Sequence, residues 1–301
     1  MKDTVSIIIA TLAHSSRKAV IWRAIDSILR QKGVNCLPIV IVNGEKYDSE
    51  LRLSLERDPR LQSYYVAQGS FPNAIVEGRR HVDTEFYCFL DDDDILLEDS
   101  VVSRIRRFRE DNSLDVVVGN GYKCDGSNSV LGFGSDAEAI HRLETDPLGN
   151  LCQFNWLASC AGLYKADSID IPYFEDYTKY YEWTYLAFRL ALTKRIGFVG
   201  EPTYKIFSSS ESMSKTDDYI EGQVELVHKL KRLNVSEKSA RLLIDRFCRE
   251  RYHDLSNYYR QQKDSAKAWK YHLYSVSNAS GLKFLSYSRH LVMDSLKSVL
   301  K

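Results

Sequence analysis

The chain has 301 residues, 44% of them hydrophobic and 12% aromatic, which is enough to fill a large globular core and excludes a disordered chain. Lys plus Arg and Asp plus Glu both number 41, so no global charge points to nucleic acid or to acidic ligands. The charges are unevenly distributed along the chain. Residues 217–301 contain 16 basic and 10 acidic residues, a net of +6, so residues 1–216 contain 25 and 31, a net of −6.

Strand-like and helix-like segments alternate in the first part of the chain. Apolar runs predict strands at residues 5–12, 37–44, 61–67, 86–90 and 114–121. Amphipathic stripes predict helices between them, at residues 17–31, 48–57, 73–82 and 98–110. This alternation predicts an α/β fold with a doubly wound, mostly parallel sheet flanked by helices. Ligands bind such sheets at the carboxyl ends of the strands.

The remainder of the chain has a different pattern. Between residues 122 and 216 we expect the following segments: a Gly/Ser-rich loop (125–135), a strand (156–164), a helix (181–194), a short strand (196–200) and a polar loop (207–218). Residues 218–300 predict three or four helices with almost no strand.

Targeting signals are not evident in the sequence. Residues 1–14 lack the cleavable apolar core of a signal peptide, and no apolar run approaches the ~20 residues of a membrane span. The six cysteines show no C-x-x-C pair. We therefore expect a reducing, cytoplasmic location.

Four aspartates directly follow the predicted strand 86–90, in the segment FYCFLDDDDIL (86–96). Residues 91–94 contain the D-x-D spacing twice. Two such acids past a rigid strand can offer one carboxylate to a divalent cation and the other to a ribose or sugar hydroxyl. The alternative is a solvated acidic turn at the start of the next helix, where Asp is favourable. The spacing by itself does not separate these two interpretations.

Six segments, in order, resemble the family 2 glycosyltransferases of the GT-A fold. They are VSIIIATL (5–12), AIDSILRQ (24–31), IVIVNGEKYD (39–48), EFYCFLDDDDIL (85–96), SCAGLYKADSI (159–169) and PYFEDY…YEWTYLAFRLA (172–191). The resemblance implies a GT-A domain over residues 1–216, with a donor half at about 1–121 and an acceptor half at about 122–216, and a helical C-terminal region over 217–301. It also implies inverting transfer of a sugar from a nucleotide diphosphate.

Carried over residue by residue, the resemblance gives roles to the aspartates. Asp91 matches the acid expected near the ribose or sugar of the donor. Asp93 matches the acid expected to bind Mn²⁺ or Mg²⁺ beside the diphosphate. Asp92 and Asp94 are expected to assist by tuning or capping.

Two further segments match the nucleotide-binding part of the family. Thr11 and Ala13 match the loop under the nucleotide. Asn43 stands where the family has a base-contacting Asp, so it lacks that charge and leaves the nucleotide preference open. A UDP-sugar is the expected donor.

The general base of the family is a carboxylate at the start of the acceptor-side helix, within hydrogen-bond reach of the acceptor hydroxyl. Here the Glu-Asp pair of the family is Glu182-Trp183. We expect Glu182 to be the base and keep Asp176 in reserve. The alternative is that Glu182 only caps the helix and that the chain is a catalytically silent relative that binds nucleotide or glycan.

The expected function is therefore metal-dependent glycosyl transfer to a glycan or lipid-linked acceptor in surface polysaccharide biosynthesis. The last segment, 281–301, predicts a basic amphipathic helix. It can contact an anionic membrane surface, or pack against neighbouring helices or a second subunit. Its apolar stripe comprises Leu282, Leu285, Val292, Leu296 and Val299, and its polar side carries Lys283, Arg289, Lys297 and Lys301.

Overall fold

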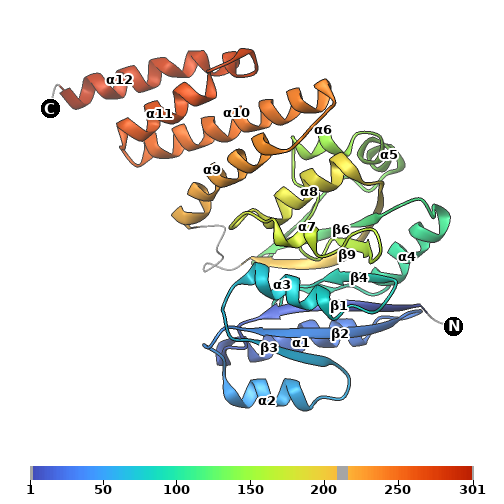
Figure 1. Ribbon diagram of the computed structural model, residues 1–301. Coiled ribbons are helices and arrows are strands. Elements are labelled where there is room, and N and C mark those ends of the chain that lie inside the picture. Colours follow the sequence, from blue (N-terminus) through green and yellow to red (C-terminus); the bar gives the residue numbers. More distant parts are fainter. Residues whose placement is uncertain (1–2, 209–215, 300–301) are drawn as a thin grey trace. The chain divides into compact units, whose positions relative to one another are not determined.

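The computed structural model describes residues 3–208 and 216–299, and these form two compact units (Figure 1). The first unit consists of residues 3–177 and 186–208, and the second of residues 178–185 and 216–299. Within the described residues, no helix combines the length and the apolar character needed to cross a membrane.

A sheet of nine strands, counted over the described residues, forms the centre of the first unit. Its order is β3-β2-β1-β4-β8-β6-β9-β5, with β7 paired to β6. The first four are parallel neighbours: β3 (Gln62–Val66), β2 (Asn35–Asn43), β1 (Thr4–Thr11) and β4 (Phe86–Phe89).

The other half of the sheet is mixed. Strand β8 (Gly162–Lys165) runs antiparallel to β4 and to β6 (Val116–Asp125). Strand β9 (Ile196–Ser208) runs parallel to β6, and the short β5 (Ile95–Leu96) runs antiparallel to β9. The predicted doubly wound, mostly parallel α/β sheet is confirmed.

Helices cover the sheet because each has an apolar face. The helices are α1 (Lys18–Leu29), α2 (Ser49–Arg57), α3 (Phe71–Arg80), α4 (Ser100–Glu110), α5 (Ala137–Thr145), α6 (Pro147–Leu151), α7 (Pro172–Glu175) and α8 (Glu182–Thr193), with a 3₁₀ turn, η1 (Ser15–Arg17), before α1. Figure 1 shows α1 and α3 on opposite sides of β1 and β2. Helix α3 packs closely, because a Cβ on Gly78 would lie 2.3 Å from Cγ2 of Ile8.

Two predicted segments of the first unit are wrong. The expected loop at residues 125–135 contains strand β7 (Asn128–Leu131), which pairs antiparallel with β6. Gly126 has φ 59°, and this left-handed residue lets the chain turn within the two residues Gly126 and Ser127. The strand expected at 156–164 is shorter, because β8 begins only at Gly162 and the preceding residues form turns.

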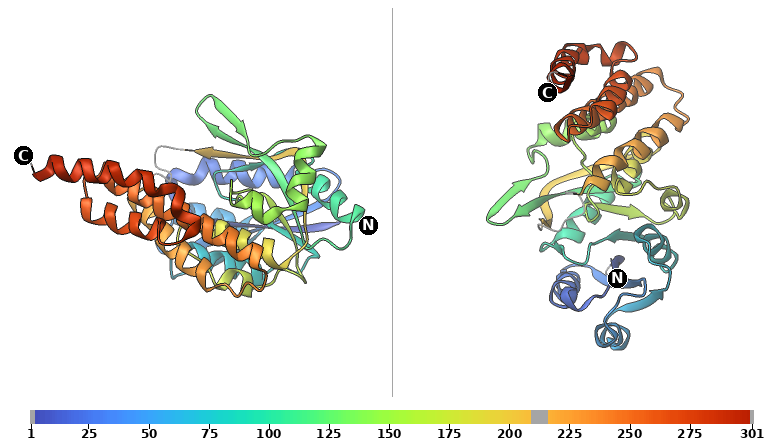
Figure 2. Two further views of the ribbon diagram at one scale, coloured as in Figure 1. Left: turned by 90° about the horizontal axis from the view of Figure 1, so that it is seen from above. Right: turned by 90° about the vertical axis from the view of Figure 1, so that its left-hand side faces the viewer.

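The second unit is helical, as predicted. It contains α9 (Asp217–Arg232), α10 (Lys238–Gln261), α11 (Ser265–Ser275), the 3₁₀ helix η3 (Ala279–Tyr287) and α12 (Ser288–Val299). Figure 2 gives two further views of these helices. The single helix expected at 281–301 is wrong, since η3 precedes α12; residues 300–301 lie outside the described residues. Most of the polar loop expected at 207–218 also lies outside them.

A fully buried arginine joins α4 to the segment before β8. Nη1 of Arg104 donates to the carbonyl oxygens of Cys160 (3.1 Å) and Ala161 (3.2 Å). Its Nε donates to the carbonyl oxygen of Ser100 at 3.1 Å, and its Nη2 to Oγ of Ser100 at 2.9 Å. The guanidinium therefore fixes the backbone that carries Ser159.

We expect Arg104→Met to lower the free energy of unfolding by about 3 kcal/mol, because methionine leaves buried acceptors without a donor. Urea unfolding measures the change. The matched control is Arg106→Met, the same substitution at an exposed position of the same helix, with an expected change within about 0.5 kcal/mol. Equal changes in the two variants would contradict the role given to Arg104.

Candidate functional site

Three loops meet at the carboxyl edge of the parallel strands. Strands β1, β2 and β4 end at Thr11, Asn43 and Phe89, and they are parallel neighbours in the sheet. The residues that follow them therefore emerge at one edge, as sequence reasoning predicts. The four aspartates begin two residues after the end of β4.

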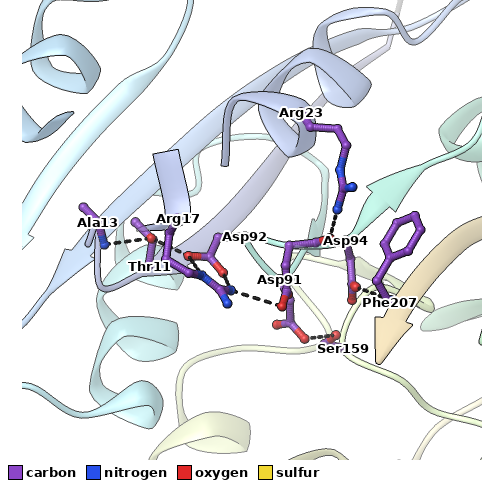
Figure 3. Close-up of polar contacts among 10 residues, drawn as sticks. Thr11, Ala13, Arg17, Arg23, Asp91, Asp92, Asp94, Ser159 and Phe207 are labelled. Carbon is purple, nitrogen blue, oxygen red and sulfur yellow. Dashed lines mark hydrogen bonds and ion pairs between the residues drawn. The ribbon is translucent and has the colours of Figure 1, made fainter. Parts of the chain in front are cut away.

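Asp92 is buried and held by the loop that follows β1 (Figure 3). Thr11 Oγ1 donates to Asp92 Oδ2 at 2.5 Å, and the backbone N–H of Ala13 donates to Thr11 Oγ1 at 2.9 Å. Ala13 itself is buried and has φ 46°, a left-handed conformation that turns the chain back under the aspartates. Thr11, Ala13 and Asp92 are thus brought together.

Arg17 is the cation that bridges two of the aspartates. Its guanidinium forms an ion pair with Asp92, to which Nε also donates at 3.3 Å, and Nη2 lies 3.2 Å from Oδ2 of Asp93. Burial lowers the pKa of Arg17, but its hydrogen bond and charge interactions with Asp92 and Asp93 outweigh this effect and raise it. Arg17 therefore stays protonated and neutralises part of the acidic cluster.

Among the described residues, Asp91 and Asp94 have no ion pair of this kind. Ser159 Oγ donates to Oδ2 of Asp91 at 2.8 Å, and the backbone N–H of Phe207 donates to Oδ1 of Asp94 at 3.0 Å (Figure 3). Burial is the first cause that raises the pKa of Asp91, to about 7, and of Asp94, to about 9. The neighbouring carboxylates add to both shifts, so this cluster favours additional positive charge.

The charge balance fits a divalent cation bound through few protein ligands. No group of three or more His, Cys, Asp or Glu side chains that could hold a metal occurs among the described residues. Mg²⁺ usually takes only one or two carboxylates, with water and phosphate oxygens completing its shell. Asp93, whose side chain is 35% exposed, is the aspartate that we expected to bind it.

Asn43 is buried, and its amide has a structural partner. The backbone N–H of Ser70 donates to Oδ1 of Asn43 at 2.8 Å. Ser70 is the residue before α3, so Asn43 ties the end of β2 to the start of that helix. Contact between Asn43 and a nucleotide base stays a prediction.

The two candidate bases lie in different surroundings. Glu182 is the first residue of α8, and its Oε1 accepts a hydrogen bond from the N–H of Tyr180 at 3.1 Å. Burial is the main cause that raises its pKa above the ordinary value. Asp176 is exposed at the end of α7, where Nη1 of Arg189 donates to its carbonyl oxygen at 3.3 Å. Asp176 belongs to the first unit and Glu182 to the second.

Sequence reasoning missed four residues that organise the aspartates. Arg17 lies just before α1 and Arg23 lies within it, and Arg23 donates to the carbonyl oxygen of Asp93. The guanidinium of Arg23 also lies 4.4 Å from the ring centroid of Phe207. An Arg shortly after the first strand is a weak signal for this contact. Ser159 and Phe207 carry no signal, because they come from distant parts of the chain.

Comparison with known proteins relates part of the chain to a family. The model of glycosyl transferase family 2 matches residues 6–167, which is more than half of the chain. No curated protein matches.

Solved structures with a similar fold include S. aureus TarS 1–349 in complex with UDP-GlcNAc. That structure is 16% identical, with a TM-score of 0.61 over 89% of this chain and 76% of that chain. The same protein in complex with UDP is 14% identical, with a TM-score of 0.58 over 89% and 75% of the two chains. These likenesses confirm the expected GT-A fold with C-terminal helices.

The raised pKa of Asp94 predicts a pH dependence of stability. At pH values between the ordinary aspartate pKa of ~3.9 and the raised pKa of about 9, Asp94 keeps its proton in the folded protein and loses it in the unfolded chain. The free energy of unfolding therefore falls as the pH rises through this range. We expect a fall of more than about 1 kcal/mol between about pH 5 and about pH 8 in metal-free buffer. Asp94→Asn keeps the acceptor for Phe207 and removes the charge, so the fall should shrink by at least half.

Urea unfolding at several pH values measures this effect, with Asp83→Asn, at an exposed aspartate, as the control. An identical pH dependence in wild type and Asp94→Asn would contradict the assignment.

Proposed function

Because the chain belongs to glycosyl transferase family 2, we propose that it transfers a sugar from a UDP-sugar to a glycan or lipid-linked acceptor in surface polysaccharide biosynthesis. The observation that carries the proposal is the aspartate cluster at the carboxyl end of β4, which lies inside the segment matched by the family. The similar fold of TarS, solved with UDP-GlcNAc and with UDP, supports uracil as the base of the donor. The six cysteines form no disulfide, which supports a cytoplasmic location.

Different aspartates of the cluster are proposed to bind the ribose or sugar and the diphosphate of the donor. Asp91, fixed by Ser159, is proposed to accept hydrogen bonds from the ribose or the sugar. A Mn²⁺ or Mg²⁺ ion held by Asp93 would neutralise the charge that develops on the leaving diphosphate. The guanidinium of Arg17, already beside Asp93, supplies positive charge to the same place. Thr11 and Ala13 form the floor of the site by holding Asp92.

Transfer with inversion needs a base for the acceptor hydroxyl, and we assign Glu182. Its carboxylate takes the hydroxyl proton as the acceptor oxygen bonds to the anomeric carbon, and the bond from that carbon to the diphosphate oxygen breaks. Burial, which raises the pKa of Glu182, makes the carboxylate a stronger base. This assignment rests on the family resemblance and on the surroundings of Glu182. Asp176 is the reserve.

Release of UDP from a panel of UDP-sugars tests the donor site. We expect slow release by the wild type with one or a few of these sugars. Asp91→Asn and Asp93→Ala should each reduce it by about 100-fold or more, because each removes charge stabilisation at the diphosphate or the sugar. Asp83→Ala, at the exposed aspartate near the other end of β4, should leave the rate unchanged. Wild-type rates in both site variants would contradict the donor assignment.

The pH profile of the same reaction tests the base. In the wild type we expect kcat/KM to rise with pH through a pKa above the ordinary carboxyl value, since burial raises the pKa of Glu182. Glu182→Gln should abolish this rise of kcat/KM with pH and reduce kcat by about 100-fold or more.

Asp176→Asn is the matched variant at the reserve position. If Asp176→Asn loses activity and Glu182→Gln keeps it, Asp176 is the general base. UDP binding with no turnover of any donor or acceptor tried would favour the catalytically silent relative.

A further inference from the structure

The second unit exposes an apolar strip that its own helices do not cover. It comprises exposed apolar residues of η3 and α12, and we call these residues the outer strip. Its side chains are 44–55% exposed: Leu282 (54%), Leu285 (50%), Val292 (44%), Met293 (55%) and Leu296 (54%). Single exposed apolar residues are ordinary on a protein surface, whereas several on one face mark an interaction site, and Val292, Met293 and Leu296 share one face of α12.

The orientation of α12 is set by its opposite face. Leu291 is buried, with 3% of its surface exposed. Trp269 Nε1 in α11 donates to Ser295 Oγ at 3.2 Å, and Arg260 Nε in α10 donates to Asp294 Oδ2 at 2.6 Å. At 3.6 residues per turn, Val292, Met293 and Leu296 then point away from α10 and α11. These contacts fix the rotation of α12 about its own axis, so its outer-strip residues stay exposed.

The charge around the strip identifies the partner. Arg289 is exposed on the same side of α12 as Val292 and Leu296, and it forms no ion pair among the residues that the structure describes. Residues 279–301 contain four basic residues and one acidic residue; Asp294 is paired with Arg260, and Lys283 is paired with Glu250. A second copy of this chain would bring one basic strip against another. An anionic surface would complement it.

We propose that the outer strip docks the second unit onto the surface of an anionic lipid bilayer. The apolar side chains enter the region between headgroups and acyl chains, and Arg289 binds the lipid phosphates, as basic amphipathic helices do. This proposal goes beyond glycosyl transfer and does not depend on the donor site.

Vesicle co-sedimentation of the full chain tests the proposal. We expect binding to vesicles of phosphatidylcholine mixed with phosphatidylglycerol, weak binding to phosphatidylcholine alone, and release as the salt concentration rises. The double variant Met293→Ser with Leu296→Ser should bind the mixed vesicles about tenfold more weakly or worse, because it removes buried apolar area. Arg289→Glu should weaken binding to the mixed vesicles only.

The matched control is Leu53→Ser, at a leucine 46% exposed on α2 of the first unit, and it should bind as the wild type does. Circular dichroism and UDP release check that each variant is folded. No binding of the folded wild type to mixed vesicles would overturn the proposal, as would equal binding by the double variant. A dimer, seen by light scattering, that the double variant dissociates while vesicle binding is absent would assign the strip to a second copy instead.

Discussion

Repulsion between four consecutive carboxylates is the constraint on which the first unit depends. Asp91 to Asp94 follow the end of β4 together, and contacts with several other elements hold them: Asp92 and Asp93 share Arg17, while Asp91 and Asp94 have partners of their own. The end of β1 supplies Thr11, η1 supplies Arg17, the segment before β8 supplies Ser159, and β9 supplies the N–H of Phe207. Elements far apart in the sequence must therefore be in place before the cluster is tolerated. Charge that remains uncompensated suits a site that receives a cation and a diphosphate.

Local patterns predicted most of the first unit. Apolar runs and helical stripes identified β1 to β4 and the helices between them, because each pattern lies within one element. The turn at Gly126 and Ser127 between β6 and β7 was not predicted, because the Gly and Ser residues of this segment indicate a loop. One helix is also predicted for residues 281–301, whereas the structure has η3 and then α12, which begins at Ser288. The apolar spacing of this segment did not reveal the break.

The candidate site was predictable only where its residues are adjacent in the sequence. The aspartates and Thr11 could be named from their position after strands. The bridge from Arg17 to Asp92 and Asp93 could not, because it depends on how the 3₁₀ turn before α1 places a long side chain. Arg104 illustrates the same limit. Its sequence context indicates an ordinary helix, yet the structure buries it against the carbonyl oxygens beside Ser159.

The two parts of the sequence differ in charge and in the roles that we assign to them. The acidic first 216 residues carry the cluster that we assign to the donor, and the basic remainder carries the outer strip that we assign to an anionic surface. The charge asymmetry visible in the sequence corresponds to this division of roles.

The most direct test of the donor site is calorimetric titration of the wild type with UDP, GDP, CDP and dTDP, with and without Mn²⁺. We predict that UDP binds, that Mn²⁺ strengthens its binding, and that Asp93→Ala removes the effect of the metal. If no nucleotide binds under either condition, the aspartate cluster is not a donor site and the account is contradicted.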